Sequence, residues 1–192
     1  MTPSRHAALL LAAGGSRRLG TPKQLLEMDS EPLVRRAARA LLATEPGGLY
    51  VVVGAHAEEV FRAVAEVTAE RIDCHDWEEG LSASLRAGVA ALPGDIDGVL
   101  VALCDQPAMD AVHLQRLIER FRLHPSDAVA SAYSRVLGVP AVLPRAWFEE
   151  LSELRGDLGA RELLRSASQV VHPVGAPALA FDVDRSSDRS QL

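Results

Sequence analysis

The most informative stretch of the chain reads Leu11-Ala-Ala-Gly-Gly-Ser-Arg-Arg-Leu-Gly-Thr-Pro-Lys-Gln-Leu-Leu26, directly after an apolar run at residues 7–11. Glycine has no Cβ, so a glycine-rich loop can turn sharply and aim its amide groups at a phosphate chain. The glycines here are Gly14, Gly15 and Gly20, and the basic residues are Arg17, Arg18 and Lys23. In a chain with a formal net charge of −6, this local positive charge indicates a loop that binds a polyanion.

Two widespread phosphate-binding loops do not fit this stretch. A Walker A loop ends in Gly-Lys-Ser/Thr, whereas Gly20 is followed by Thr21, Pro22 and Lys23. The dinucleotide fingerprint G-x-G-x-x-G needs a glycine two positions after the first one, and position 17 is an arginine. The loop therefore belongs to neither class.

Apolar runs alternate with amphipathic stretches along the chain. Strands are predicted at residues 7–12, 49–53, 71–74, 99–103 and 128–132. Helices are predicted near residues 32–43, 58–69, 82–92 and 110–123. This order predicts an α/β fold, a doubly wound and mostly parallel sheet with helices on both faces. A strand at 139–143 is expected to join the sheet as an antiparallel addition.

Composition and charge limit the classes of protein to which this chain can belong. With 192 residues, 48% of them hydrophobic, we expect one domain over 1–192 and a polar tail at 185–192 that can fray. No apolar run approaches the roughly 18 to 20 residues that span a bilayer, and no secretory signal is recognisable, so we expect a cytoplasmic protein without a membrane partner. A pI near 5.5 argues against nucleic acid as a partner. Cys74 and Cys104 lack C-x-x-C spacing, which predicts neither zinc nor disulfide chemistry.

A carboxylate follows the predicted strand at 99–103, within Cys104-Asp-Gln-Pro107. Ligands of such sheets bind at the carboxyl ends of the strands, where the glycine loop is also expected. A buried carboxylate without compensation is costly, and Mg²⁺ bridging Asp105 and phosphate oxygens would remove that cost. A second carboxylate is offered by Phe181-Asp-Val-Asp184, with Asp182 and Asp184 on one side of a predicted short strand. The alternatives are a capping or turn role for Asp105 and a structural role for Asp184.

The remaining candidates each have a structural interpretation beside the functional one. Trp77 could stack on a flat ring or pack in the core. Arg161 opens a predicted helix and could reach an acceptor phosphate or point into solvent. Ser82 is expected to cap the helix that contains Arg86. The six histidines show no H-x-x-x-H spacing, so at least five are expected to be structural or exposed, and none is a favoured catalyst.

The pattern L-A-A-G-x-S-x-R-x-G-x-x-K-x-L-L resembles the nucleotide loop of the molybdenum-cofactor nucleotidyltransferases, in the Ala-Ala form of the cytidylyltransferase branch. Further segments extend the resemblance over nearly the whole chain: Cys104-Asp-Gln-Pro107, Trp77-Glu-Glu-Gly-Leu-Ser-Ala-Ser-Leu-Arg-Ala-Gly88, Gly138-Val-Pro140 and Gly156-Asp-Leu-Gly-Ala-Arg161. The chain departs from the family pattern at two places. Cys74 replaces the usual asparagine before the tryptophan, and Asp184-Arg-Ser-Ser-Asp188 replaces D-T-P-E-D.

The resemblance implies a Rossmann-like fold of the nucleotide-diphospho-sugar transferase type. It implies an enzyme that joins CMP from CTP to a phosphorylated acceptor, typically molybdopterin, and releases pyrophosphate with Mg²⁺ as cofactor. A molybdenum hydroxylase or its maturation factor is a further implied partner. Two other interpretations stay open: transfer to a sugar phosphate, methylerythritol phosphate or phospholactate, and a non-catalytic carrier of the finished cofactor.

Residue roles follow from the same resemblance. The nucleotide is assigned to Leu11, Ala12, Ala13, Gly14, Gly15, Ser16, Arg18, Lys23 and Ser84. The catalytic residues are Arg18, Lys23 and Asp105. The acceptor is assigned to Trp77, Gln106 and Arg161, and the metal to Asp105 and Asp184.

Overall fold

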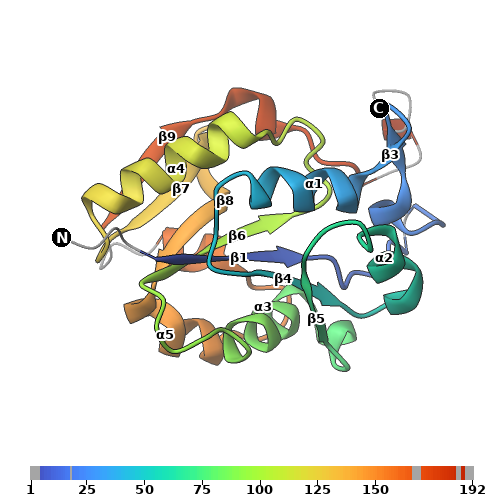
Figure 1. Cartoon of the computed structure of the whole chain (residues 1–192), viewed down its shortest axis with the longest axis horizontal. Coiled ribbons are helices and arrows are strands. Elements are labelled where there is room, and N and C mark those ends of the chain that lie inside the picture. The colour runs from blue at the N-terminus through green and yellow to red at the C-terminus, as the bar shows by residue number, and fades with distance from the viewer. Residues whose placement is uncertain (1–4, 18, 166–169, 185–186, 189–192) are drawn as a thin grey trace.

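A central sheet organises the chain in the computed structural model, which describes residues 5–17, 19–165, 170–184 and 187–188 (Figure 1). Its strands within this part of the chain are β1 (His6–Leu11), β4 (Leu49–Val53), β5 (Glu70–Asp73), β6 (Gly98–Leu103), β7 (Ala128–Tyr133), β8 (Val136–Pro144) and β9 (Val171–Gly175). They lie side by side in the order β5-β4-β1-β6-β8-β7-β9. A separate short hairpin is formed by β2 (Glu27–Met28) and β3 (Glu31–Pro32).

Strand direction confirms the predicted sheet. Strands β5, β4, β1 and β6 run parallel to one another, and β8 is antiparallel to both β6 and β7. The expected antiparallel strand at 139–143 therefore lies within β8. Strand β9, which pairs in parallel with β7, was not predicted. It contains Pro173, which cannot donate to a ladder and is tolerated because β9 is the edge of the sheet.

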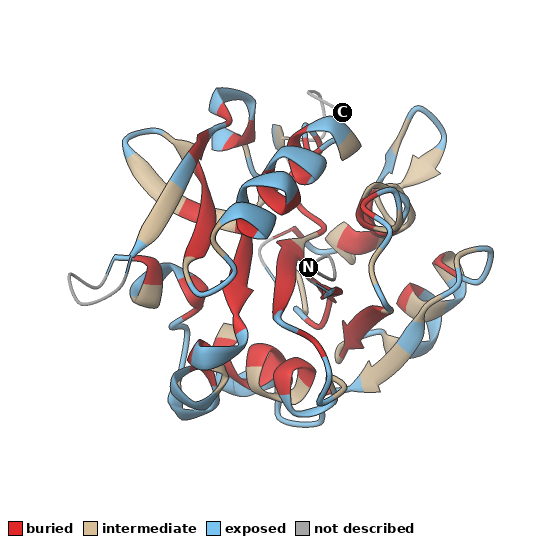
Figure 2. Cartoon of the chain, turned by 60° about the vertical axis from the view of Figure 1, so that its left-hand side comes forward, coloured by how far each residue is buried: buried red, intermediate tan, exposed pale blue. Residues whose placement is uncertain are grey.

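Helices cover both faces of the sheet (Figure 1). One face packs against α1 (Leu33–Leu42), α2 (Ala57–Ala63) and α4 (Ala111–Leu123). The other packs against α3 (Leu81–Ala90), α5 (Phe148–Glu153) and α6 (Ala160–Leu164). Strand β1 serves both cores because side chains alternate along a strand: Ala8 and Leu10 lie in the first core, Ala7 and Leu9 in the second. Figure 2 shows this burial concentrated in the central strands and the helix faces turned toward them.

Several local predictions are corrected by the structure. Helix α2 ends at Ala63 instead of continuing to residue 69, because turns at residues 64–67 lead the chain into β5. Ser82 does not cap α3, which begins at Leu81, and its hydroxyl donates a hydrogen bond to the carbonyl oxygen of Gly156 at 2.7 Å. Asp110 caps α4 as predicted, since its carboxylate accepts from the His113 amide at 2.8 Å.

The C-terminal segment differs from the predicted short strand. Residues 181–184 form no strand, and the Val183 amide instead donates to the Asp105 carbonyl oxygen at 2.9 Å. This bond holds the segment beside the end of β6. The tail expected to fray at 185–192 lies outside the described residues except for Ser187 and Asp188. No helix of the described chain is long and apolar enough to cross a membrane.

Candidate functional site

Two loops meet at the carboxyl ends of the central strands, because they follow the adjacent parallel strands β1 and β6. Leu11 at the end of β1 lies in register with Leu103 at the end of β6, so the glycine loop and Asp105 emerge side by side. The chain order also changes direction here, since β4 and β5 extend from one side of β1 and β6 lies on the other. Crevices at such switch points are the usual ligand sites of open α/β sheets.

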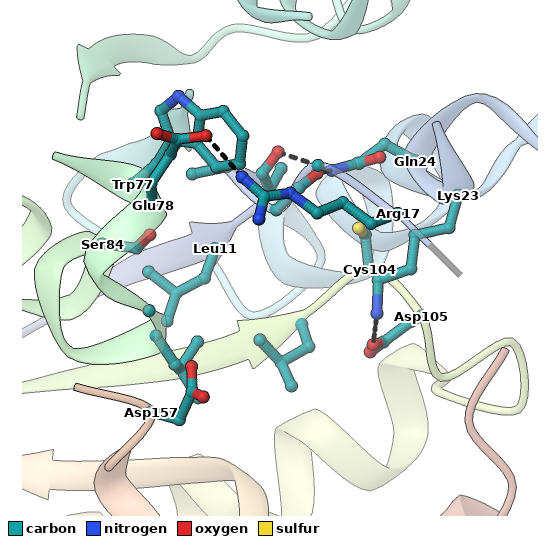
Figure 3. Close-up of a pocket in the computed structure, with 17 residues that line it drawn as sticks. Leu11, Arg17, Lys23, Gln24, Trp77, Glu78, Ser84, Cys104, Asp105 and Asp157 are labelled. Carbon is teal, nitrogen blue, oxygen red and sulfur yellow. Dashed lines mark hydrogen bonds and ion pairs between the residues drawn. The ribbon is translucent and has the colours of Figure 1, made fainter. Parts of the chain in front are cut away.

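A cavity of about 470 Å³ opens at these strand ends (Figure 3). Its volume is in the range of small-molecule sites. The residues that sequence reasoning assigned to a ligand and that line it are Leu11, Ala12, Ala13, Gly14, Gly15, Lys23, Trp77, Ser84 and Asp105. Arg18 lies outside the described residues, so its side chain has no described position.

The glycine loop is held from inside by a side chain that sequence reasoning missed. Gln24 is 1% exposed, and its amide nitrogen donates to the carbonyl oxygens of Ala12 at 2.9 Å and Gly14 at 2.7 Å. Gly20 has φ +74°, a conformation that favours glycine. The only signal for Gln24 in the sequence was its place next to Lys23, because a pattern of apolar residues does not identify a buried amide.

Ser16 also belongs to this internal support. Its hydroxyl accepts from the Lys23 amide at 2.9 Å and contacts the side-chain oxygen of Gln24 at 3.4 Å. Ser16 was expected to bind a nucleotide, but it is not among the described residues that line the cavity. Its side chain thus fixes the start of the 3-10 turn Lys23–Leu25.

Trp77 forms one wall of the cavity, on the side of the glycine loop (Figure 3). A Cβ added to Gly15 would lie 2.8 Å from the Trp77 ring, so glycine at this position permits the ring to pack against the loop. The Arg17 guanidinium lies 5.8 Å from the ring centroid and pairs with Glu78. Trp77 was assigned to an acceptor, whereas the structure places it with the residues assigned to the nucleotide.

Lys23 is the only lysine in the chain, beside nineteen arginines. Its ammonium forms an ion pair with Asp105 and lies 3.4 Å from an oxygen of Asp184. Burial alone lowers the pKa of an amine, but the charge and hydrogen bond of Asp105 outweigh it, and the pKa of Lys23 is raised above its ordinary value. The side chain therefore carries a fixed positive charge at the cavity.

The carboxylates around Lys23 have spare ligand capacity. Asp105 is 6% exposed, and no group in the described part of the chain donates a hydrogen bond to its buried Oδ1. Burial, with the charges of Asp105 and Asp184, raises the pKa of Asp182 to about 6. A concentration of carboxylates with an unpartnered buried oxygen is chemically suited to a hard divalent cation. Asp105 and Asp184, the predicted metal ligands, both reach the same ammonium.

A second cavity of about 240 Å³ adjoins the first, and the two share Leu81, Leu103 and Asp157 as lining residues. Gln106, Arg161 and Asp182 lie in this second cavity. Its wall at Gly138 and Val139 is supported by Tyr133, whose hydroxyl donates to the Val139 carbonyl oxygen at 3.0 Å. The structure therefore brings Gln106 and Arg161, both assigned to the acceptor, to one cavity, and it adds Tyr133 and Asp157, to which sequence reasoning gave no role.

Comparison with known proteins connects this geometry to a family. The family model described as "MobA-like NTP transferase domain" matches residues 8–171. The chain is 37% identical to nicotine blue oxidoreductase of Paenarthrobacter nicotinovorans, over 85% of this chain and 83% of that protein. It is 28% identical to purine catabolism protein PucB of Bacillus subtilis, over 82% of this chain and 80% of that protein.

Solved structures agree in fold over almost the entire chain. Rv0371c of Mycobacterium tuberculosis superposes with a TM-score of 0.82 at 27% identity, covering 98% of this chain and 97% of that one. The same protein was also solved in complex with manganese. A nucleotidyl transferase of Methanothermobacter, Mth528, shares the fold with a TM-score of 0.81 at 23% identity, covering 97% and 95% of the two chains. With the model matched over residues 8–171 and the fold shared end to end, the chain belongs to the MobA-like NTP transferase family.

Proposed function

We propose that this protein is a nucleotidyltransferase that joins CMP from CTP to a phosphorylated acceptor, molybdopterin, and releases pyrophosphate. One observation carries the proposal. Asp105 lines the cavity beside the glycine loop, and the next residue, Gln106, lines the adjoining cavity beside Arg161. A nucleotide in the first cavity and an acceptor phosphate in the second would meet at this dipeptide.

The reaction needs positioning more than acid–base chemistry. A terminal phosphate oxygen of the acceptor, already ionised, attacks the α-phosphorus of CTP and forms the new P–O bond. The bond from the α-phosphorus to the bridging oxygen breaks, and pyrophosphate leaves with that electron pair. Lys23 stabilises the negative charge that develops, together with the amides of Gly14 and Gly15 and with Arg18, whose role rests on the resemblance alone. Leu11, Ala12, Ala13 and Ser84 shape the nucleotide cavity.

Mg²⁺ is the proposed cofactor, held by Asp105 and Asp184. The unpartnered Oδ1 of Asp105 and the carboxylates around Lys23 fit a hard cation. When bound, such an ion neutralises charge on the transferring and leaving phosphates. The manganese complex of Rv0371c supports divalent-metal binding in a relative of the same fold.

The acceptor site is proposed at Arg161, Gln106 and Trp77. Arg161 supplies a guanidinium that can bind a phosphate in two-point fashion. Trp77 lies farther toward the nucleotide loop, so its ring is suited to stack on either the base or the pterin. A molybdenum hydroxylase or its maturation factor is the proposed recipient of the product, in the cytoplasm, with neither nucleic acid nor membrane as a partner.

CTP is expected to bind about 10-fold more tightly than GTP, a difference of about 1.4 kcal/mol. The Ala12-Ala13-Gly14 form of the loop carries one glycine fewer than the guanylyl branch, so its methyl groups crowd a purine more than a pyrimidine. Competition binding in the presence of Mg²⁺ measures the ratio. Tighter binding of GTP would overturn the cytidylyl assignment while leaving nucleotidyl transfer open.

Pyrophosphate release from CTP and Mg²⁺ tests the reaction itself, with molybdopterin, methylerythritol phosphate and a sugar phosphate as acceptors. Release with molybdopterin alone is expected, and release with a sugar phosphate alone would change the acceptor. The oxidoreductase name of one relative supplies the contrasting assay. Redox turnover of nicotine blue by this protein, without pyrophosphate release, would overturn transferase activity.

A further inference from the structure

Three potential metal ligands lie together near the amino ends of β7 and β9, at the opposite end of the strands from the cavities: His124, Asp127 and His172. His124 directly follows α4, Asp127 directly precedes β7, and His172 lies at the start of β9. Because β7 and β9 run parallel to β1 and β6, their first residues lie far from the glycine loop, which follows the last residue of β1 (Figure 1). This cluster is therefore separate from Asp105.

Backbone structure holds the three residues in place. The Asp127 amide donates to the His124 carbonyl oxygen at 3.1 Å, which closes a turn and brings these two residues together. The Ala128 amide donates to the Val170 carbonyl oxygen at 3.1 Å, and the parallel ladder that follows places His172 beside Val129. Two histidines that are 48 positions apart in the sequence thus meet through the β7–β9 pairing.

Their side chains are already close to ligand separations. His172 Nε2 lies 2.9 Å from Asp127 Oδ2, and one ligand atom from each of the three residues falls within 4.8 Å of the others. The two imidazole rings stack with centroids 4.4 Å apart. Ligand atoms bound tetrahedrally at about 2.0–2.1 Å lie about 3.3 Å apart, so the His172–Asp127 edge needs to widen by only about 0.4 Å.

The charges around the cluster divide into favourable and opposing contributions. His124 is the C-cap of α4, where the helix dipole places partial negative charge that attracts a cation. The Asp127 carboxylate adds a full negative charge. Against these, the exposed Arg120 approaches His172 Nδ1 with one guanidinium nitrogen at 3.4 Å. Arg120 is on the protein surface, so it can turn into solvent without disturbing the fold.

We propose that His124, Asp127 and His172 bind a divalent transition-metal ion such as Zn²⁺, at a site distinct from the nucleotide site. Two imidazoles and one carboxylate suit Zn²⁺ and Ni²⁺, whereas Mg²⁺ prefers oxygen ligands. The ion replaces the proton between His172 Nε2 and Asp127 Oδ2, that proton moves to Nδ1 of the same ring, and Arg120 turns away. The bound ion cross-links the end of α4 to the edge strand β9 and stabilises that edge.

Titration calorimetry and thermal unfolding test the site, in the Asp105→Asn chain so that the nucleotide site contributes least. One Zn²⁺ per chain is expected, with weaker binding of Mg²⁺ than of Zn²⁺. Zn²⁺ at about 100 times its Kd should raise the Tm by about 5 to 10 °C. His172→Ala should weaken Zn²⁺ binding by more than the about 10- to 100-fold that loss of an outer partner costs. The exposed His75 provides the matched control, since His75→Ala should leave binding unchanged.

Arg120→Gln gives a test that cannot be confused with unfolding. The substitution removes the guanidinium that has to leave His172 Nδ1 when the ion binds, and its remaining repulsion of the ion, so Zn²⁺ binding should tighten by about 10-fold. The absence of Zn²⁺ binding at one ion per chain, or Zn²⁺ binding that is unchanged in His172→Ala, would overturn the proposal. Pyrophosphate release is measured on these variants in the Asp105-containing chain, where it should be unaffected, so failure of the metal site and failure of the proposed reaction are distinguishable.

Discussion

Asp105→Asn is expected to lower the rate of Mg²⁺-dependent pyrophosphate release by about 100-fold or more while the chain stays folded. The substitution keeps the size and shape of the side chain but removes the charge at the junction of the two cavities. Lys23 loses its partner, yet its side chain is 22% exposed and lies 3.4 Å from Asp184. The free energy of unfolding should therefore fall by no more than about 1 to 3 kcal/mol.

The matched control for this variant is Asp29→Asn. Asp29 is exposed on the turn between β2 and β3, away from both cavities, so the same chemical change there should leave the rate unchanged. Denaturant unfolding reports stability and a continuous pyrophosphate assay reports the rate. A near wild-type rate in folded Asp105→Asn protein would remove Asp105 as a metal ligand and leave a structural role beside Lys23.

Lys23→Ala should also reduce turnover by about 100-fold or more, because it removes the only lysine, which lines the cavity proposed to bind the nucleotide. The Asp105 carboxylate, with 9% of its side chain exposed, is then left without its cation. We expect the free energy of unfolding to fall by about 1 to 3 kcal/mol, which a domain with 5 to 15 kcal/mol of stability tolerates.

Lys23→Arg separates catalysis from stability. A guanidinium restores positive charge beside Asp105, but its planar fork cannot place a compact ammonium at the same point. Stability should recover while turnover stays at least about 10-fold below wild type. Arg62→Ala, which removes an exposed charge from α2, is the control. If Lys23→Arg recovered the full rate along with stability, Lys23 would act only as a generic positive charge.

Helices and strands with a clear apolar pattern and recognisable residues at their ends were predictable from the sequence. Strand β6 is a continuous apolar run buried on both faces, and the cap at Asp110 fixed the start of α4. Strand β9 was not predictable because Val-His-Pro-Val-Gly lacks both alternation and a fully apolar run. It is a strand because β7 offers a free edge, which is a property of the assembled sheet.

The candidate site was predictable where the chemistry lies in short contiguous motifs. The α/β pattern placed the glycine loop and Asp105 at the same end of the sheet, and the observed pairing of β1 with β6 brings them together. Contacts between distant segments were not predictable. The packing of Trp77 on Gly15 and the buried amide of Gln24 depend on how loops fold over one another. The same holds for His124 and His172, which no local spacing connects.

The lone ε-amine determines how this protein can be chemically modified. Dyes, cross-linkers and immobilisation resins directed at lysine have one side chain to react with, and it lines the cavity beside the glycine loop. Asp105 keeps that amine protonated and hence poorly nucleophilic, so acylation requires the ion pair to open. Thiol reagents offer no alternative route, because Cys74 and Cys104 are both buried. Lysine coupling therefore either leaves this side chain untouched or blocks the cavity, and the extent of labelling at Lys23 itself, measured by peptide mapping, reports whether a ligand protects it.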